Sequence, residues 1–209
     1  AEAGDGQILS LHSYTSGTDP YVLFSAYRRR FEDGKEHYRR LFETASLTGA
    51  RYVILHGDRQ EGVLPEEEVF SRFEELYDLG REQGVLLLQE NVVRFRSADV
   101  GYIRRMREAL GEKANFVFDI KQCARCGLEP PAVIEAMGTG LRHVHISDQA
   151  AGKDCLVPGR GTDDYAALLR RMKAVGFSGD WIMELYRENF QELEELAEGR
   201  LFLEKTIKS

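Results

Sequence analysis

Six short apolar runs occur along the chain, and each ends in a residue that can bind a metal ion or transfer a proton. Nearly continuous apolar runs are typical of parallel strands, because such strands are covered on both faces. A charged group beside a buried strand is costly unless it is paired or coordinated. A reactive residue at the same end of every strand therefore indicates a function. The runs are Ile8–His12, Tyr52–His56, Val85–Glu90, Phe116–Asp119, Val144–Asp148 and Trp181–Glu184.

Segments with helical spacing of apolar residues separate these runs. Tyr38, Leu41, Phe42 and Ala45 lie three and four positions apart, which predicts a helix over residues 36–46 that is closed by Gly49. Proline and acidic residues suit a first helical turn and glycine suits a helix end. On these signals we predict further helices from Pro65 to Gly84, from Ser97 or Asp99 to Gly111, from Pro130 to Gly138, from Thr162 or Asp163 to Gly176, and from Gln191 to Ile207.

This alternation of strands and helices predicts an α/β protein with right-handed crossovers and a parallel sheet. A doubly wound sheet also fits the alternation, but no GxGxxG or GxxxxGK[ST] motif follows any strand. Reactive residues on every strand fit the mouth of a TIM (β/α)8-type barrel better. Such a barrel typically needs about 250 residues, and this chain has 209 residues with about six recognisable strands. We therefore expect a single domain over residues 1–209 that is incomplete at the N-terminus, with the first one or two βα units missing.

Charge and cysteine content narrow the class of protein. The formal net charge of −7 and the pI near 5.4 argue against nucleic acid as a partner, because phosphate contacts rely on Lys and Arg. No apolar stretch is long enough to span a membrane, and the acidic start is not that of a signal peptide. We expect a cytoplasmic protein. The Cys123–Cys126 spacing lacks a second CxxC pair, so we interpret these cysteines as structural thiols.

Five strings, taken in chain order, resemble the xylose isomerase-like TIM-barrel superfamily, which includes sugar phosphate isomerases and epimerases and family 2 apurinic-site endonucleases. The resemblance covers residues 8 to 186. Each string alone is weak, and the ordered set carries the resemblance. The strings are Leu88–Val92, Phe116–Gln122, His143–Asp148, Val157–Gly161 and Trp181–Tyr186.

The resemblance implies that Glu90, Asp119, His145 and Glu184 hold one divalent metal ion. Three carboxylates and one imidazole form an oxygen-rich site that suits Mn²⁺, Mg²⁺, Co²⁺ or Zn²⁺. Such an ion polarises a sugar carbonyl and stabilises the enediolate that follows proton loss. The resemblance further implies that Glu90 and Glu184 flank the substrate as catalytic acid and base, and proton return on the opposite face would epimerise it. The expected activity is a sugar or sugar-phosphate isomerase or epimerase of carbohydrate metabolism.

Other residues are predicted to contact the substrate. His12 and His56 resemble histidines that line this barrel mouth. A role in substrate binding, a structural role and metal ligation all remain open for these two residues. Lys121 and Arg160 are candidates to hold a phosphate or a hydroxyl group. The predicted substrate-binding set is His12, His56, Lys121, Gln122, Asp148 and Arg160.

Alternative functions stay open at this point. A dehydratase would use the same chemistry and expel a β-hydroxyl. A metal-dependent endonuclease or phosphodiesterase of the same superfamily is a further alternative, but those enzymes carry a histidine where this chain has Gln122, and the loop over residues 150–155 has no histidine. The last alternative is a non-catalytic barrel or an inactive fragment. Relatives are commonly dimers or tetramers, which implies a homo-oligomer.

Overall fold

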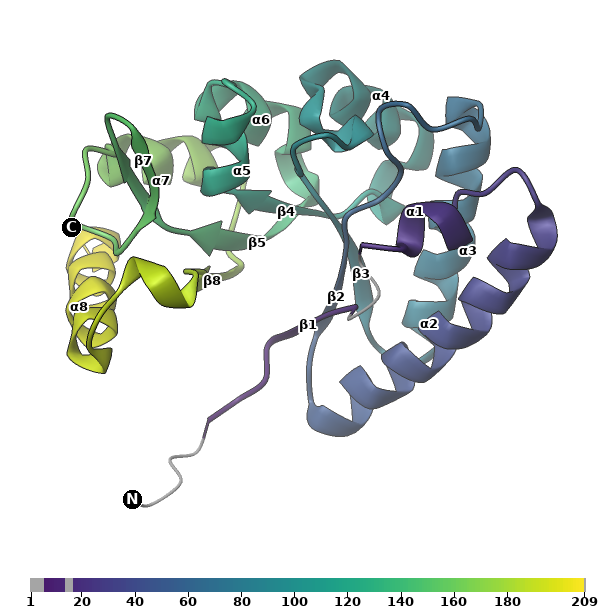
Figure 1. Ribbon diagram of the computed structural model, residues 1–209, viewed down its shortest axis with the longest axis horizontal. Helices are drawn as coiled ribbons and strands as arrows, with labels where there is room; N and C mark the ends of the chain where they lie inside the picture. Colours follow the sequence, from purple (N-terminus) through teal and green to yellow (C-terminus); the bar gives the residue numbers. More distant parts are fainter. Residues whose placement is uncertain (1–5, 14–16, 209) are drawn as a thin grey trace. The chain divides into compact units, whose positions relative to one another are not determined.

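The computed structural model describes residues 6–13 and 17–208 (Figure 1). Contacts between residues divide the chain into two compact units. The first unit comprises the chain up to residue 90 together with residues 94–115, and the second comprises residues 91–93 and the chain from residue 116 onward. Parallel strands with covering helices form both units, and each unit is described by itself.

The first unit contains three parallel strands in the order β1-β2-β3. Their covering helices α2 and α3 pack against each other and against β2 and β3 (Figure 1). Large apolar side chains on one face of α2, among them Phe31 and Phe42, are fully buried in this core. The elements are β1 (Ser10–His12), α1 (Asp19–Val22), α2 (Arg28–Thr48), β2 (Tyr52–Leu55), α3 (Glu66–Glu82), β3 (Leu86–Glu90), η1 (Arg96–Ala98), α4 (Val100–Leu110) and η2 (Gly111–Lys113).

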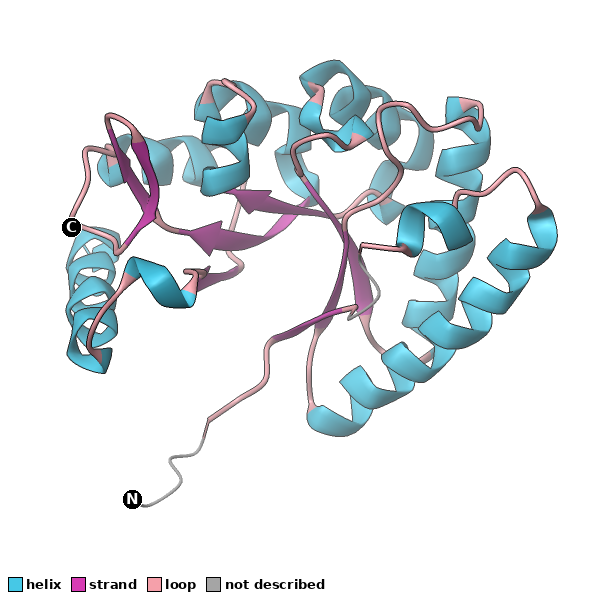
Figure 2. Cartoon of the chain, viewed as in Figure 1, coloured by secondary structure: helices cyan, strands magenta, loops and turns pink. Residues whose placement is uncertain are grey.

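The second unit contains three parallel strands in the order β4-β5-β8 and a separate antiparallel hairpin of β6 and β7 (Figure 2). Every residue of β4 is buried, as expected for a strand covered on both faces. The elements are β4 (Phe116–Asp119), α5 (Ile120–Arg125), α6 (Pro130–Met137), η3 (Gly138–Gly140), β5 (Leu141–Ile146), β6 (Asp148–Ala150), β7 (Lys153–Leu156), α7 (Tyr165–Ala174), β8 (Asp180–Met183), η4 (Arg187–Asn189) and α8 (Leu193–Lys208).

The helix boundaries follow the predicted signals except at the N-terminal cap of α7 and at the start of α2. Of the two predicted caps for α4, Asp99 is the one that accepts hydrogen bonds from the first turn. The predicted caps for α7, Thr162 and Asp163, are wrong, because Asp164 accepts the hydrogen bond from the amide of Ala167. Helix α2 begins at Arg28, earlier than predicted, since its first two turns are mostly charged. The sequence did not predict the short helices α1 and α5 or the β6–β7 hairpin, because their apolar residues show no regular spacing.

No helix in the described part of the chain is long and apolar enough to cross a membrane. The three cysteines are free thiols, and Cys123 and Cys155 are buried. Burial raises the pKa of the Cys123 thiol to about 12, so this thiol stays protonated and unreactive near neutral pH. The interpretation of Cys123 as a structural thiol agrees with its surroundings.

Candidate functional site

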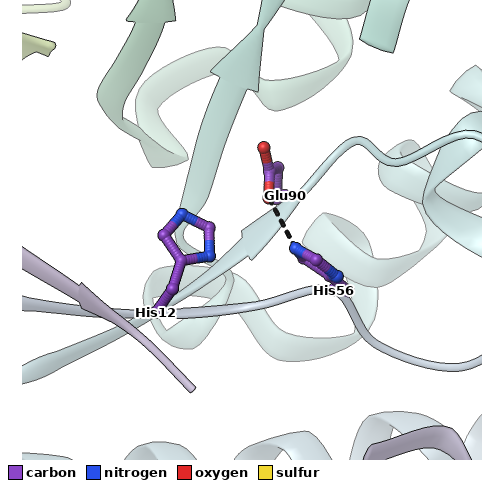
Figure 3. A group of neighbouring side chains, drawn as sticks. All are labelled: His12, His56 and Glu90. Atoms are coloured by element: carbon purple, nitrogen blue, oxygen red, sulfur yellow. Dashed lines mark ion pairs between the residues drawn. The ribbon is translucent and has the colours of Figure 1, made fainter. Parts of the chain in front are cut away.

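In the first unit, the carboxyl ends of the three strands bring together two histidines and a glutamate (Figure 3). His12 ends β1, His56 directly follows β2, and Glu90 ends β3. Their ligand atoms all lie within 4.8 Å of one another. His56 Nε2 is 3.2 Å from Glu90 Oε2, and the ring centroids of His12 and His56 are 5.7 Å apart. We name this group the first-unit cluster.

Gln89 braces this cluster from the buried side of β3. Its side-chain Nε2 donates to the main-chain oxygens of His56 at 2.7 Å and Glu90 at 2.9 Å. Gly57 leaves the space for this amide, because a Cβ atom at Gly57 would lie 2.5 Å from Gln89 Oε1. Sequence reasoning missed Gln89, whose only signal was an amide within an otherwise apolar run.

In the second unit, three of the predicted metal ligands meet around a lysine. Asp119 ends β4, His145 lies in β5, and Glu184 directly follows β8. His145 Nδ1 is 3.2 Å from Glu184 Oε2 and 3.8 Å from Asp119 Oδ2. Lys121, from α5, donates to Asp119 Oδ2 at 2.7 Å and to Glu184 Oε2 at 2.8 Å. We name these residues the second-unit cluster.

Charge pairing sets the protonation of the second-unit cluster. Burial lowers the pKa of Lys121, but the carboxylates of Asp119 and Glu184 outweigh this effect and raise it above its ordinary value. Burial likewise raises the pKa of Glu184, while His145 and Lys121 outweigh burial and lower it. Lys121 therefore stays charged and Glu184 stays ionised near neutral pH.

Asn91 positions Asp119 through its main chain. The Asn91 side chain donates to the main-chain oxygen of Asp119 at 3.0 Å and accepts from its amide at 2.8 Å. Asp119 Oδ1 accepts from the amide of Gln122 at 2.8 Å, and Gln122 Oε1 accepts from the amide of Val93 at 3.2 Å. Sequence reasoning missed Asn91, although a polar residue directly after the Glu90 strand end was a usable signal.

Asp148 and Arg160 have partners within the second unit. The carboxylate of Asp148 accepts hydrogen bonds from the amides of Gln149, Gly159 and Gly161 at 2.8 to 2.9 Å. Arg160 pairs with two carboxylates of α8, Glu195 and Glu198. These contacts order the loop that follows β7. Substrate binding by either side chain stays a prediction.

Both clusters have the donor chemistry of a metal site. The second-unit cluster offers two carboxylates and one imidazole, the oxygen-rich set that divalent ions prefer. The ammonium group of Lys121 already occupies the position of a cation between Asp119 and Glu184. The first-unit cluster offers two imidazoles and one carboxylate. The predicted ligand set takes Glu90 from the first unit and Asp119, His145 and Glu184 from the second, and its assignment as one set stays a prediction.

The chain matches the family of xylose isomerase-like TIM barrels over residues 4–206. It therefore belongs to that family, and the predicted α/β fold of the TIM-barrel class is confirmed.

Among curated relatives, a putative hydroxypyruvate isomerase of Streptomyces coelicolor is 30% identical over 141 residues, which are 61% of this chain and 49% of that protein. The chain spans about half the length, or less, of the curated relatives that it matches.

Solved structures of low sequence identity share the fold. A D-psicose 3-epimerase superposes with a TM-score of 0.75 and 14% identity, over 97% of this chain and 79% of that chain. The IolI protein with a bound zinc atom superposes with a TM-score of 0.72 and 18% identity, over 96% of this chain and 76% of that chain.

Proposed function

We propose that the protein is a divalent-metal-dependent isomerase or epimerase of a sugar or sugar phosphate. The observation that carries the proposal is the second-unit cluster, where Asp119, His145 and Glu184 come from three parallel strand ends and gather around a cationic group. The curated relative named as a putative hydroxypyruvate isomerase and the fold shared with a D-psicose 3-epimerase support this class of reaction, and the fold shared with the zinc-bound IolI protein supports a divalent metal.

In this proposal, Glu90, Asp119, His145 and Glu184 hold one divalent ion, Mn²⁺, Mg²⁺, Co²⁺ or Zn²⁺. The bound ion supplies a positive charge that polarises the sugar carbonyl and makes the neighbouring carbon more acidic. Asn91 orients Asp119 and Gln89 orients the main chain at Glu90 and His56. The ligand carboxylates are thus held by residues that do not themselves react.

Glu184 is the proposed base. Its carboxylate is ionised, because His145 and Lys121 keep its pKa low, so it can accept the proton from the carbon next to the carbonyl. Glu90, which lies beside His56, is the proposed acid: in its protonated form it gives a proton to that carbon from the opposite face. This step leaves Glu90 ionised and Glu184 protonated, and proton exchange with solvent restores both residues. Transfer between the two faces inverts the stereocentre, whereas return to the neighbouring carbon gives an isomerase.

The remaining predicted residues bind the substrate in this proposal. His12 and His56 lie beside Glu90 in the first-unit cluster, and Lys121 lies beside Glu184, so these three lie next to the proposed acid and base. Gln122, Asp148 and Arg160 complete the set. A homo-oligomeric state and a cytoplasmic location stay predictions.

Proton exchange with solvent tests the proposal. The purified protein is loaded separately with each of the four metal ions and incubated in D₂O with a panel of ketoses, ketose phosphates and hydroxypyruvate. NMR then measures deuterium at the carbon next to the carbonyl. We expect metal-dependent incorporation that is lost on chelation and in the Glu184→Gln variant. Absence of exchange with every metal and every substrate would contradict the proposal.

A metal-dependent phosphodiesterase is the second candidate. The first-unit cluster favours it, because two imidazoles and a carboxylate could bind a further ion, and phosphodiester cleavage commonly uses two or more metals. The acidic charge of −7 counts against a nucleic-acid substrate. Metal-dependent cleavage of duplex DNA with one abasic site, in the absence of any exchange on sugars, would select this candidate over the first.

A further inference from the structure

A cavity of about 350 Å³ lies in the first unit. Its walls come from α1, the segment that joins α1 to α2, the start of α2 and the loop after β2, and they include Tyr21, Phe24, Arg30 and Arg59. The volume is in the range of small-molecule sites, which are mostly apolar with a few convergent polar groups. None of these wall residues belongs to the predicted substrate-binding set.

Two guanidinium groups face this cavity with unused hydrogen-bonding capacity. Arg59 Nε is buried and has no hydrogen-bond partner among the described residues, and its NH1 group lies 3.6 Å from the carboxylate of Glu61, beyond hydrogen-bond distance. Arg30 has an exposed side chain with no ion pair in the part of the chain that the structure describes. The guanidinium nitrogens of Arg59 other than the buried Nε belong to a side chain that is 37% exposed, so they can donate charge-assisted hydrogen bonds to a ligand oxygen in the cavity.

The acidic residues around the cavity do not cancel this charge. Asp58 also lines the cavity, but its carboxylate is bound by Arg96 Nε at 2.9 Å and by the amide of Arg59 at 2.9 Å. Glu61 is the other acidic wall residue, and its side chain is 70% exposed. Arg96 balances the charge of Asp58. The two positive charges of Arg30 and Arg59 exceed the single negative charge of Glu61, so the wall carries one net positive charge.

An aromatic wall lies beside the two arginines. The guanidinium carbon of Arg59 is 5.1 Å from the ring centroid of Tyr21, and Phe24 forms a buried part of the same wall. Stacking against an aromatic ring orients a guanidinium group, whose planar set of donors matches the oxygens of a phosphate or a carboxylate. Apolar ring surface beside an anion site suits the carbon chain of a small ligand.

The cavity is linked to the first-unit cluster through Phe95. Arg59 pairs with Phe95 as an isolated antiparallel bridge, and the Phe95 ring centroid is 5.6 Å from that of His56. Phe95 therefore contacts both a wall residue of the cavity and a member of the first-unit cluster.

We propose that this cavity binds the oxyanionic end, a phosphate or a carboxylate, of a small carbohydrate. Arg59 and Arg30 bind the oxyanion, and Tyr21 and Phe24 contact the carbon chain. The identity of the ligand as a carbohydrate rests on the proposed function, whereas the oxyanion site rests on the cavity and its arginines alone. The protein then selects anionic substrates over neutral sugars.

Binding to chelator-treated protein tests the site apart from any metal or turnover. Inorganic phosphate is titrated into the protein by isothermal calorimetry, and glycerol 3-phosphate, glycerate and glycerol follow as probes with one carbon skeleton and different end groups. We expect one phosphate per chain, and binding of at least one of the two anionic probes but not of glycerol. Arg59→Gln and Arg30→Gln should each weaken phosphate binding by about ten-fold or more, because each removes a charge-assisted contact.

Arg29→Gln is the matched control, because Arg29 is the neighbour of Arg30 on α2, is 75% exposed and pairs with Asp33 outside the cavity wall. It changes the net charge equally and should leave phosphate binding unchanged. Arg30→Gln guards against a folding defect of Arg59→Gln, since Arg30 is exposed. Absence of phosphate binding, equal loss in the control, or equal binding of glycerol would overturn the proposal. Phosphate binding that depends on the arginines, in a protein without deuterium exchange, would uphold this site while contradicting the proposed function.

Discussion

Lys121 and Glu184 are 63 residues apart in the chain, yet Lys121 Nζ donates to Glu184 Oε2 at 2.8 Å. The same ammonium group binds Asp119 at 2.7 Å, so one lysine pairs with two of the proposed metal ligands. Removal of one partner from a buried ion pair leaves an uncompensated charge. Lys121 therefore stabilises the second-unit cluster, and under the proposed function it competes with the metal ion for the two carboxylates.

Lys121→Met should make the stability of the protein depend on metal. Without metal, we expect a loss of about 3 kcal/mol in the free energy of unfolding, because the buried Asp119 carboxylate loses its cation. A saturating divalent ion should restore much of this loss by taking the place of the ammonium group. Urea unfolding with chelator and with Mn²⁺ measures both effects.

Lys113→Met is the matched control for this experiment. Lys113 also binds two carboxylates, those of Glu74 and Asp78 at 2.8 and 2.9 Å, but at the surface, where solvent screens the pairing. We expect little change in stability and no dependence on metal. Equal behaviour of the two variants would show that the Lys121 pairing has no special connection with a cation site.

Glu184→Gln should reduce turnover far more than it weakens metal binding. The amide keeps one oxygen ligand but cannot accept a proton, and positioned proton transfer typically contributes about 10² to 10⁴-fold to the rate. Glu90→Gln should behave similarly. Steady-state kinetics on a substrate found by deuterium exchange, with calorimetric titration of metal, separates the two effects. Unchanged turnover in either variant would remove that residue from the proposed acid–base pair.

The strands were predictable because their signal is local. Every residue of β2 is buried, and a strand that is buried on both faces is recognisable from the sequence as a continuous apolar run. The start of α2 was missed because Phe31 is the one large apolar residue in its first two turns, where the charged side chains of Arg28 and Lys35 pair with Glu75 on α3. Local spacing predicts an element only where the element buries its own apolar face.

The same distinction applies to the candidate site. Glu90 and Glu184 were visible as reactive residues at the ends of apolar runs, so the sequence indicated which side chains to consider. It could not show that Lys121 binds Glu184 or that Gln89 braces His56, because these hydrogen bonds join distant parts of the chain. Residue types at strand ends are a local signal, whereas the contacts that set their pKa and orientation are tertiary.

Gly57→Ala should destabilise the first unit and disturb the first-unit cluster. Gly57 has a φ of +87°, and an added Cβ atom would lie 2.5 Å from Gln89 Oε1, which displaces the amide that binds the main chain of His56. We expect a loss of about 2 kcal/mol or more, the sum of backbone strain and lost hydrogen bonds. Urea unfolding and the NMR shifts of the His56 ring report the two effects.

Gly49→Ala separates the backbone effect from the contact. Gly49 ends α2 with a φ of +76°, and an added Cβ atom would meet nothing within 4 Å. This variant should show only the cost of the left-handed conformation, about 1 kcal/mol, with an unchanged His56 signal. If both variants lose equal stability and leave His56 unchanged, Gln89 has no bracing role.

Glu75→Gln should destabilise the protein near neutral pH and lose this effect in acid. Burial raises the pKa of Glu75, but hydrogen bonds from Lys35 and Arg28 outweigh burial and lower the pKa below its ordinary value. A carboxylate with a lowered folded-state pKa contributes stability that is fully present above the unfolded-state pKa of about 4.3 and is lost as the pH falls through the folded-state value. The difference in unfolding free energy between the two proteins should therefore be constant from about pH 7 to 5 and shrink below about pH 4.

Glu108→Gln is the control, since Glu108 is exposed on α4 with no ion pair among the described residues, and its small effect should not vary with pH. A Glu75→Gln difference that persists at the acid end would mean that the shape of the side chain, and not its charge, holds α2 against α3.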